Sequence, residues 1–171
     1  MSLSGLRKMP GQNRMPAQKP GQSRQDYSTP KEFLVAVERR FGSITFDLAA
    51  HRDNHVRPKW YGPGGLAEDS LAQDWSALGG HLWLNPPFGD IATWARKCAS
   101  TLLRLGATIS FLVPASVGAN WFALHVWGHA HVIALNGRLS FDGKNPFPKD
   151  CILCRYHTAK VSSFGVWDWR E

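Results

Sequence analysis

The residues best suited to chemistry in this sequence are Asn85, Pro86, Pro87 and Phe88, which follow the apolar run 81–84. Neither proline can donate a backbone hydrogen bond, so an extended segment must end there in a rigid turn whose carbonyls are not needed for sheet pairing. Asn85 adds a side-chain oxygen acceptor, and Phe88 adds a flat apolar ring that can stack on a heteroaromatic ring. Together these groups describe a pocket for an exocyclic amino group on an aromatic base.

The same four residues also have a purely structural interpretation. Asn and Pro are common turn residues, and Asp90 is well placed to cap a helix that follows the turn. From the residue types alone, NPPF is therefore either an acceptor site or a strand-to-helix turn, and its surroundings must decide between the two.

Two helices are predicted before and after this turn. Thr29 as N-cap, Pro30 at the first helical position and Glu32 as the partner in a capping box predict a helix that stops at Gly42. A second helix is predicted over 90–106, capped by its first residue and ended by its last, which is glycine. Its inward-facing residues are expected to be Ile91, Trp94, Ala95, Cys98, Leu102 and Leu105.

Strand patterns alternate with these helices. Buried strands are predicted over 43–50, 81–84, 107–114 and 131–135, with a further helix over 118–127. Residues 51–78 show no regular period and predict a long loop. Short alternating segments at 138–141, 151–156 and 164–169 predict antiparallel strands at one edge. The expected fold class is α/β, with an open, mostly parallel sheet flanked by helices.

Two of the predicted strands end in residues that suggest a site. The first closes on Asp47 and then on Ala49 and Ala50, and the second closes on the NPPF turn. Ligands of open α/β sheets bind beyond the carboxyl ends of the strands. We therefore expect Asp47 and Asn85 to be neighbours.

The formal charge of +7 is concentrated at the N-terminus. Residues 1–25 hold five basic groups and no acidic group, whereas residues 26–171 hold 15 basic and 13 acidic groups. The first segment is also rich in Gly, Pro, Gln and Ser, which predicts a disordered basic tail beside one domain over 26–171. That tail either contacts phosphates or is only a solvated leader.

Cysteines and histidines give no convincing metal site. Cys151 and Cys154 have the spacing of half a zinc site, but residues three apart in a strand point to opposite faces. Three cysteines supply no disulfide framework, and the seven histidines show no ligand spacing. No stretch reaches the roughly 18 apolar residues of a membrane span. We expect an intracellular protein with neither metal nor membrane partner.

The NPPF turn stands within a series of motifs that resembles the phage-type DNA N-6-adenine methyltransferase family, a group of S-adenosylmethionine-dependent amino-methyltransferases. The motifs are TP at 29–30, FDLAAHRDN at 46–54, EDSLAQDW at 68–75, LWLNPPF at 82–88, WARKC at 94–98, LVPAS at 112–116, NWF at 120–122 and NGRLSF at 136–141. The resemblance implies a Rossmann-like methyltransferase fold. It also implies a phage or prophage protein that acts on DNA in the cytoplasm of a bacterial host.

The resemblance implies a catalytic role for the NPPF residues. Asn85 and the carbonyl of Pro86 would accept hydrogen bonds from the target amino group, with Pro87 completing the rigid corner and Phe88 stacking on a flipped adenine. The methyl group would pass directly from S-adenosylmethionine to the amino nitrogen, without a metal.

Two further residues are candidates for contact with DNA. Trp121 is a candidate for the base pocket, although aromatic residues at helical spacing more often belong to the core. Arg138 matches an arginine of the family and would meet either a DNA phosphate or a buried acid.

The resemblance also implies a set of contacts to S-adenosylmethionine. Thr29 and Pro30 would lie near the methionine carboxylate, and Asp47 near its amino group. Further contacts are implied for Ala49, Asn54, Asp69, Leu71 and Asp74. Structural alternatives exist for some of them, since Thr29 is a good helix cap and both Asp69 and Asp74 can cap local turns.

The sequence departs from the broader methyltransferase pattern after the first strand. Many such enzymes carry a glycine-rich turn there, whereas this chain has Ala49 and Ala50. Alanine permits a close approach of backbone but disfavours positive φ, so the cofactor loop must be built differently.

Other functions stay open from the sequence alone. An amino-methyltransferase acting on cytosine, on RNA or on a protein glutamine would use the same acceptors, and a non-catalytic nucleic-acid binder would use the basic tail. A body of this size has little room for a separate recognition domain. Sequence recognition is therefore expected in the loops at 51–78 or 137–149, and the oligomeric state is not predicted.

Overall fold

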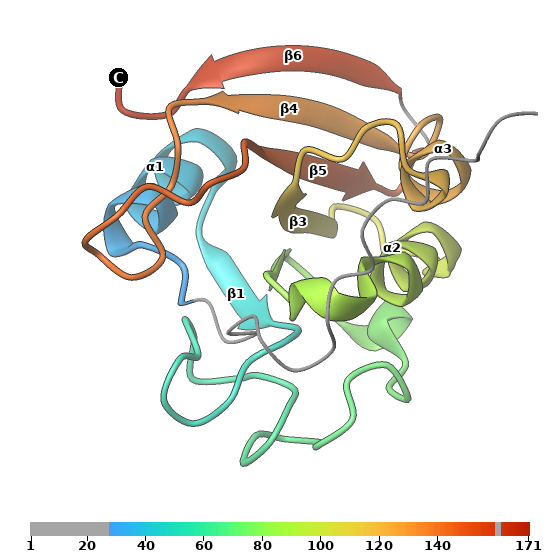
Figure 1. Cartoon of the computed structure of the whole chain (residues 1–171). Helices are drawn as coiled ribbons and strands as arrows, with labels where there is room; N and C mark the ends of the chain where they lie inside the picture. The colour runs from blue at the N-terminus through green and yellow to red at the C-terminus, as the bar shows by residue number, and fades with distance from the viewer. Residues whose placement is uncertain (1–27, 160–161) are drawn as a thin grey trace, which may run out of the picture.

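The computed structural model describes residues 28–159 and 162–171, so the predicted basic tail at 1–25 lies outside the described residues. Helices and strands alternate along most of the chain (Figure 1). The helices are α1 (Lys31–Phe41), α2 (Ile91–Ser100) and α3 (Asn120–His125), with short 3-10 helices η1 (Trp75–Ala77) and η2 (Phe88–Asp90). The strands are β1 (Ile44–Asp47), β2 (His81–Leu84), β3 (Thr108–Pro114), β4 (Ala130–Asn136), β5 (Cys151–His157) and β6 (Ser163–Asp168).

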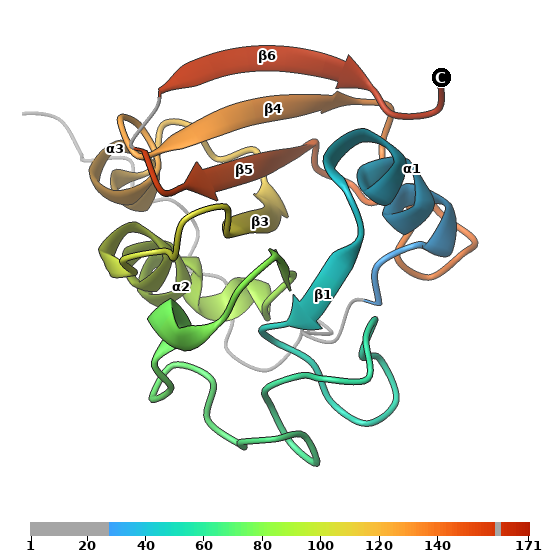
Figure 2. The same cartoon turned by 180° about the vertical axis from the view of Figure 1, so that it is seen from behind.

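Among the described residues, the strands form one six-stranded sheet in the order β1-β2-β3-β5-β4-β6. β1, β2 and β3 pair in parallel, as do β4 and β6, whereas β5 is antiparallel to both of its neighbours, β3 and β4. Five strands therefore run in one direction and end at the same edge. The view from behind shows β6, β4 and β5 one below another in the upper half of the molecule, in the order they have in the sheet (Figure 2). The predicted α/β class is confirmed.

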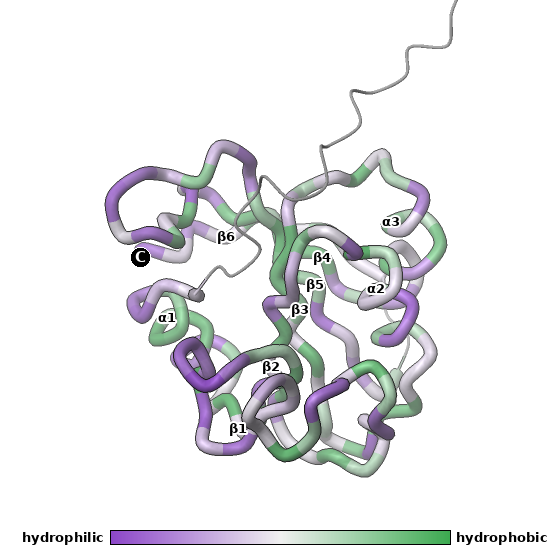
Figure 3. Tube along the Cα trace, turned by 60° about the horizontal axis from the view of Figure 1, so that its bottom comes forward, coloured by the Kyte–Doolittle hydropathy of each residue, from purple (hydrophilic) through white to green (hydrophobic). Residues whose placement is uncertain are grey.

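Each face of the sheet carries its own apolar core. Side chains alternate along a strand, so Leu82 and Leu84 of β2 join the core on the α2 and α3 side, while Trp83 joins the core on the α1 side. Figure 3 shows α1 on one side of the strands and α2 with α3 on the other, with mostly green, hydrophobic segments along the central strands. This burial on both faces explains why every residue of β2 is buried.

The antiparallel strand does not lie at the edge, where the sequence predicted it. β5 occupies the interior of the sheet because its residues are buried on both faces, with Cys151 in the α1-side core and Cys154 in the other. The edge strand β6 is largely exposed and runs parallel to β4. Residues 138–141, predicted as a strand, form no strand, and Leu139 is instead fully buried in the α1-side core.

The start of α1 differs from the predicted capping box. Pro30 is the N-cap, no side chain caps the helix, and Glu32 is exposed. The Thr29 hydroxyl accepts a hydrogen bond from Asn85 instead of one from the helix. The predicted stop is confirmed, because Gly42 adopts a φ of 90° and its N–H donates to the carbonyl of Glu38.

Helix α2 is shorter than predicted. Its start is confirmed, since the Asp90 carboxylate accepts the N–H of Thr93 at 3.3 Å. Its end is not, because the hydroxyls of Ser100 and Thr101 both donate to the carbonyl of Lys97 and close the last turn. The chain then leaves the helix.

Two leucines assigned to the inner face of that longer helix are therefore exposed. Leu102 and Leu105 have 85% and 96% of their surface accessible, whereas Leu103 is buried. The predicted helix over 118–127 also shortens, to α3.

Cys151 and Cys154 point to opposite faces of β5, as their spacing predicted. Burial raises the pKa of the Cys151 thiol to about 12. Within residues 28–159 and 162–171, no group of three or more His, Cys, Asp or Glu side chains is arranged to hold a metal ion. In the same part of the chain, no helix is both long and apolar enough to cross a membrane.

Candidate functional site

The ends of β1 and β2 meet, as the sequence predicted. Asp47 is paired with Trp83 in the sheet register, and the N–H of Leu48 donates to the carbonyl of Trp83 at 2.8 Å. Since Asn85 lies two residues beyond Trp83, the chain leaving β1 runs beside the NPPF corner. This is the carboxyl edge, where open α/β sheets bind ligands.

The Asp47 carboxylate faces inward and holds the loop that follows β1. One oxygen accepts the N–H of Ala49 at 3.2 Å, and the other accepts the N–H of Val56 at 3.0 Å. Only 2% of Asp47 is exposed. Burial raises the pKa of this carboxyl, although the two backbone hydrogen bonds oppose that rise. Asp47 does not line the pocket described below.

A second stretch of chain covers the outer edge of β1. Residues 59–61 run parallel to the strand end, with Asp47 and Tyr61 joined through a 3.0 Å hydrogen bond and Ala50 donating to the carbonyl of Tyr61 at 3.0 Å. Gly62 is required here, because a Cβ at this position would lie 1.8 Å from the carbonyl oxygen of Ala50. The loop is tied to α1 by an ion pair between Arg57 and Glu38.

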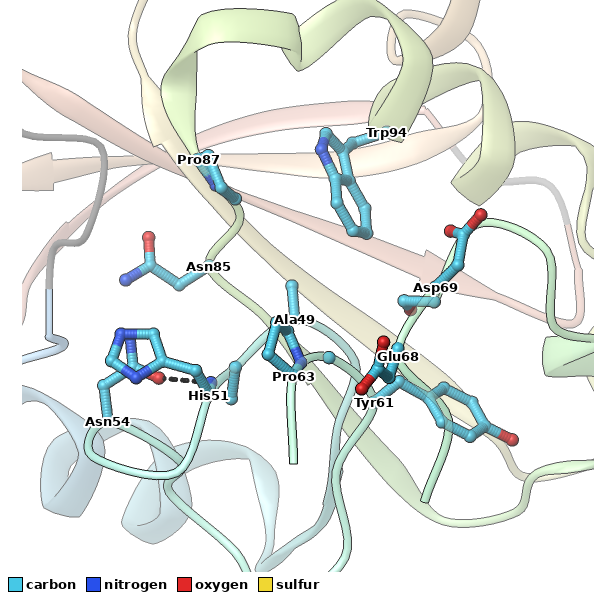
Figure 4. A pocket seen from close by; sticks show the side chains of 13 residues that line it. Ala49, His51, Asn54, Tyr61, Pro63, Glu68, Asp69, Asn85, Pro87 and Trp94 are labelled. Carbon is cyan, nitrogen blue, oxygen red and sulfur yellow. Dashed lines mark hydrogen bonds between the residues drawn. The ribbon is translucent and has the colours of Figure 1, made fainter. Parts of the chain in front are cut away.

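These segments enclose a pocket of about 270 Å³ at the carboxyl edge, just below the range of about 300–1,000 Å³ typical of small-molecule sites. Five of the residues singled out from the sequence line it: Ala49, Asn54, Asp69, Asn85 and Pro87. In Figure 4, Asn85, Asn54 and His51 lie on one side of the pocket, and Glu68, Tyr61 and Asp69 on the other. The side-chain oxygen of Asn54 accepts the N–H of His51 at 2.7 Å, which stiffens the first of these sides.

Asn85 is held in place by the start of α1. Its amide nitrogen donates to the hydroxyl of Thr29 at 3.0 Å, and Thr29 is itself buried. Neither Thr29 nor Pro30 lines the pocket. Pro86 is buried and Pro87 is exposed, so the two prolines form the base and the rim of the corner.

Phe88 belongs to a cluster of three aromatic rings. Its centroid lies 6.1 Å from that of Phe141 and 5.9 Å from that of Phe147, and those two rings are 5.2 Å apart. Phe141 and Phe147 both belong to the loop between β4 and β5. The NPPF corner is therefore in contact with that loop.

In the predicted acidic segment at 68–75, some residues line the pocket and others only stabilise local turns. Asp69 lines the pocket and also accepts the N–H of Leu71 at 2.9 Å. Asp74 caps η1 by accepting the N–H of Ser76 at 2.9 Å, and hydrogen bonds from Ser76 lower the pKa of its exposed carboxyl. Leu71 and Asp74 lie outside the pocket lining.

The two candidates for DNA contact lie away from this pocket. Trp121 packs edge-on against Phe122 at 6.0 Å and against the core on the α2 and α3 side. Arg138 is exposed, and its Nε donates to a carboxylate oxygen of Asp150 at 3.2 Å. It lines a separate groove beside α1.

Comparison with known proteins extends over most of the chain. The family model of DNA N-6-adenine-methyltransferases (Dam) matches residues 17–155. The chain belongs to the Dam family. A DNA N-6-adenine-methyltransferase of Escherichia phage T1 is 29% identical over 116 residues, which are 68% of this chain and 47% of the relative. This Dam family chain thus matches about half the length of that curated relative.

Several residues of the pocket in this Dam family member were not singled out from the sequence as site residues. They are His51, Tyr61, Gly62, Pro63, Glu68, Ser70 and Trp94, while Ala50 was noted at the strand end without a role of its own. Trp94 was predicted to face the core, and it does stack near Trp75 at 6.2 Å, but it also lines the pocket. A signal for Tyr61 and Pro63 existed in the glycine-rich run YGPGG, which marks a loop that must approach other backbone closely.

The pocket of this Dam family chain combines groups that suit a charged nucleoside. Tyr61 and Trp94 offer aromatic surface, while Glu68 and Asp69 offer carboxylates that can accept hydrogen bonds from hydroxyls or an ammonium group. Asn85 adds an amide at the other side. S-adenosylmethionine carries an adenine ring, ribose hydroxyls, an ammonium group and a positive sulfur, and these residues fit that set.

Proposed function

We propose that the protein transfers a methyl group from S-adenosylmethionine to the exocyclic amino group of adenine in DNA. Membership of the Dam family supports this reaction, and so does the similarity to the DNA N-6-adenine-methyltransferase of Escherichia phage T1. The observation that carries the proposal is that Asn85 lines a pocket directly beside the end of β1, at the carboxyl edge of the sheet. One corner can therefore face both a methyl donor and an amino acceptor.

In this proposal the sheet is a form of the Rossmann-like methyltransferase fold. The arrangement that supports it has five strands in one direction, with β5 reversed between β3 and β4. Helices cover both faces, and the pocket lies at the carboxyl ends of β1 and β2.

The residues of the pocket would hold the cofactor. Asn54, Asp69 and the backbone near Ala49 would bind its polar groups, and the rings of Tyr61 and Trp94 would bind its adenine. Asp47 would act through the loop it fixes, because both of its carboxylate oxygens accept backbone N–H groups. When bound, S-adenosylmethionine supplies a methyl group on a positively charged sulfur, ready for direct displacement by a nucleophile.

Asn85 and Pro86 would act on the target amino group. The lone pair of an aromatic amine is delocalised into its ring, so acceptors placed for a pyramidal nitrogen favour the geometry in which that pair points at the methyl carbon. The bound donor would supply the methyl group to this nitrogen by direct displacement, with the C–S bond exchanged for an N–C bond and one N–H proton lost to solvent. The hydrogen bond to Thr29 would hold the Asn85 amide in the required orientation. Positioning supplies most of the catalysis.

Phe88 would hold the target base. An adenine inside a duplex cannot reach an enclosed corner, so it must be flipped out at a cost of a few kcal/mol. Stacking on Phe88 recovers part of that cost, and the contacts with Phe141 and Phe147 keep the ring in a fixed position.

We also propose that the protein acts in the bacterial cytoplasm, where the DNA of a phage such as that of the relative is replicated.

A labelled-donor assay tests the proposed function. The protein is incubated with methyl-labelled S-adenosylmethionine and duplex DNA, RNA or protein, and the products are digested and separated. Label in N6-methyladenine from DNA is the expected result. Label only in methylcytosine, in RNA or in protein would contradict the proposal.

A further inference from the structure

A groove of about 320 Å³ lies between α1 and the two segments that follow β4 and β6. One wall is a stripe of α1, formed by Glu32, Val35, Ala36 and Arg39 at helical spacing. The other wall holds Arg138 and Ser140 from the segment after β4, and Trp169 and Arg170 from the segment after β6. We call this the arginine groove. Figures 1 and 2 both show the loop after β4 lying beside α1.

The three arginines of the groove are already held in position. Arg39 donates to the backbone carbonyl of Glu171 at 3.0 Å, and Arg170 donates to the backbone carbonyl of Arg138 at 2.9 Å. The Arg170 guanidinium also lies 4.3 Å from the centre of the Trp169 ring. The carbonyl of Arg138 orients the Arg170 guanidinium without neutralising it, so a fixed positive charge faces the groove.

Few carboxylates balance this charge. Arg138 is paired with Asp150 through Nε, at an exposed site. Asp168 accepts the backbone N–H of Arg170 and the amide of Asn136. Among the residues that the structure describes, Glu32 is the one carboxylate in the groove lining. With Arg138 paired to Asp150, Arg39 and Arg170 remain against the one lining carboxylate, which favours an anionic ligand, and the planar fork of arginine suits phosphate oxygens.

The groove and the NPPF corner lie at the same edge of the sheet. β4 and β6 end at the same edge as β1 and β2, because these strands run in the same direction. Three residues beyond Arg138, Phe141 contacts Phe88 at 6.1 Å between ring centroids. A strand of nucleic acid with one base at Phe88 would therefore place its neighbouring phosphates near the groove.

We propose that the arginine groove binds phosphodiester groups of the DNA strand beside the target base. The identity of the polymer rests on the proposed function, whereas the anionic character of the ligand rests on the groove itself. Such contacts hold the strand in register without reading its sequence. The groove would thus supply much of the affinity of this small domain for DNA.

The test is the salt dependence of DNA binding, measured by fluorescence anisotropy of a labelled duplex. Each phosphate contact contributes about 0.9 to the slope of log K against log salt concentration. Arg39→Gln and Arg170→Gln should each lower that slope by about 0.9, and the double variant should lower it by about twice that amount. Arg39→Lys and Arg170→Lys should keep the slope, because they keep the charge.

A matched control lies at the opposite edge of the sheet. Arg104 is exposed, precedes β3 and also donates to a backbone carbonyl, that of Ala77 at 3.2 Å. Arg104→Gln should leave the slope unchanged. Equal slopes for the wild type and the Arg39→Gln/Arg170→Gln double variant would overturn the proposal. Displacement of the duplex by micromolar inorganic phosphate at constant ionic strength would also overturn it, since it would reveal a free-phosphate site.

These outcomes are independent of methyl transfer. If the protein binds DNA through the groove but labels no adenine, the groove proposal stands and the proposed function is contradicted. If the protein labels adenine and the double variant binds DNA as the wild type does, the proposed function stands and the groove proposal is contradicted.

Discussion

The amide nitrogen of Asn85 donates a hydrogen bond of 3.0 Å to the hydroxyl of Thr29. The two residues lie 56 positions apart in the sequence and join the end of β2 to the start of α1. Because the amide nitrogen is turned toward Thr29, the amide oxygen points the other way. The hydroxyl that the sequence suggested as a helix cap thus fixes the orientation of Asn85, which lines the candidate pocket.

Removal of that hydroxyl should slow catalysis. Thr29→Val keeps the side-chain volume but leaves the Asn85 amide without this acceptor, so we expect kcat to fall about tenfold, equivalent to one hydrogen bond of about 1.4 kcal/mol. Thr29→Ser should retain most of the activity. The matched control is Thr158→Val, which removes a hydroxyl bonded to the carbonyl of Arg104 at the opposite edge. Steady-state kinetics with an unaltered kcat for Thr29→Val would show that this hydrogen bond does not position Asn85.

The cluster of Phe88, Phe141 and Phe147 should contribute more to DNA binding than to cofactor binding. Phe147→Ala removes a ring 5.9 Å from Phe88, and such pairs contribute about 0.5–1.5 kcal/mol. We expect the KM for DNA to rise about three- to tenfold while the affinity for S-adenosylhomocysteine is unchanged. Calorimetry and kinetics on the same preparation check both values. A loss of cofactor affinity equal to the loss for DNA would mean that the cluster supports the whole site.

The early end of α2 gives a stability prediction. Leu105 is 96% exposed, so Leu105→Ala should change the free energy of unfolding by no more than about 0.5 kcal/mol. Ile109, four residues later in β3, is fully buried, and Ile109→Ala should cost about 2–5 kcal/mol. Urea denaturation measures both. A large loss for Leu105→Ala would indicate that the helix continues to Gly106, as the sequence pattern predicted.

His81 should make the fold sensitive to acid. Its Nδ1 lies 2.7 Å from the carbonyl of Gly42, so this nitrogen carries the proton, and Nε2 accepts from the hydroxyl of Ser110 at 2.7 Å. Burial lowers the pKa of His81 below its ordinary 6.5. The unfolded chain therefore binds a proton more readily than the folded one. Stability from this group is complete above pH 6.5 and is lost as the pH falls through the lowered pKa, by at most about 1.4 kcal/mol per pH unit.

The measurement is the difference between two pH profiles. Free energies of unfolding for the wild type and for His81→Gln are determined between pH 7.5 and 5, and His157, whose pKa is also lowered by burial, contributes equally to both. The variant should lose less stability on acidification. Parallel profiles would show that His81 is not the group responsible.

The sequence predicted those parts of the fold whose signals are local. Gly42 and Asp90 mark a helix end and a helix start through their own backbone or side chain, and both were found where expected. The meeting of Asp47 with the NPPF corner followed from one rule about parallel strands. The early end of α2 has a local cause in the hydroxyls of Ser100 and Thr101, but the wrong assignment at the start of α1 has a long-range one. The hydroxyl of Thr29 bonds Asn85 rather than its own helix, and no local pattern carries that information.

The site was predicted less completely than the fold for a related reason. Motif residues such as Asn85 and Asp69 stand out by type, whereas Trp94 and Tyr61 look like ordinary core residues until the loops enclose them. The place of β5 inside the sheet likewise depends on burial of both its faces, which only the assembled layers reveal.

The most direct test of the account is the single-turnover rate of methyl transfer to DNA by Asn85→Ala, measured at saturating S-adenosylmethionine. Loss of an acceptor that acts on the reacting nitrogen should slow this step by about 100-fold or more. The affinity for S-adenosylhomocysteine should stay within about twofold of the wild type, because the other residues of the pocket are intact. A rate close to that of the wild type would contradict the central role given to Asn85.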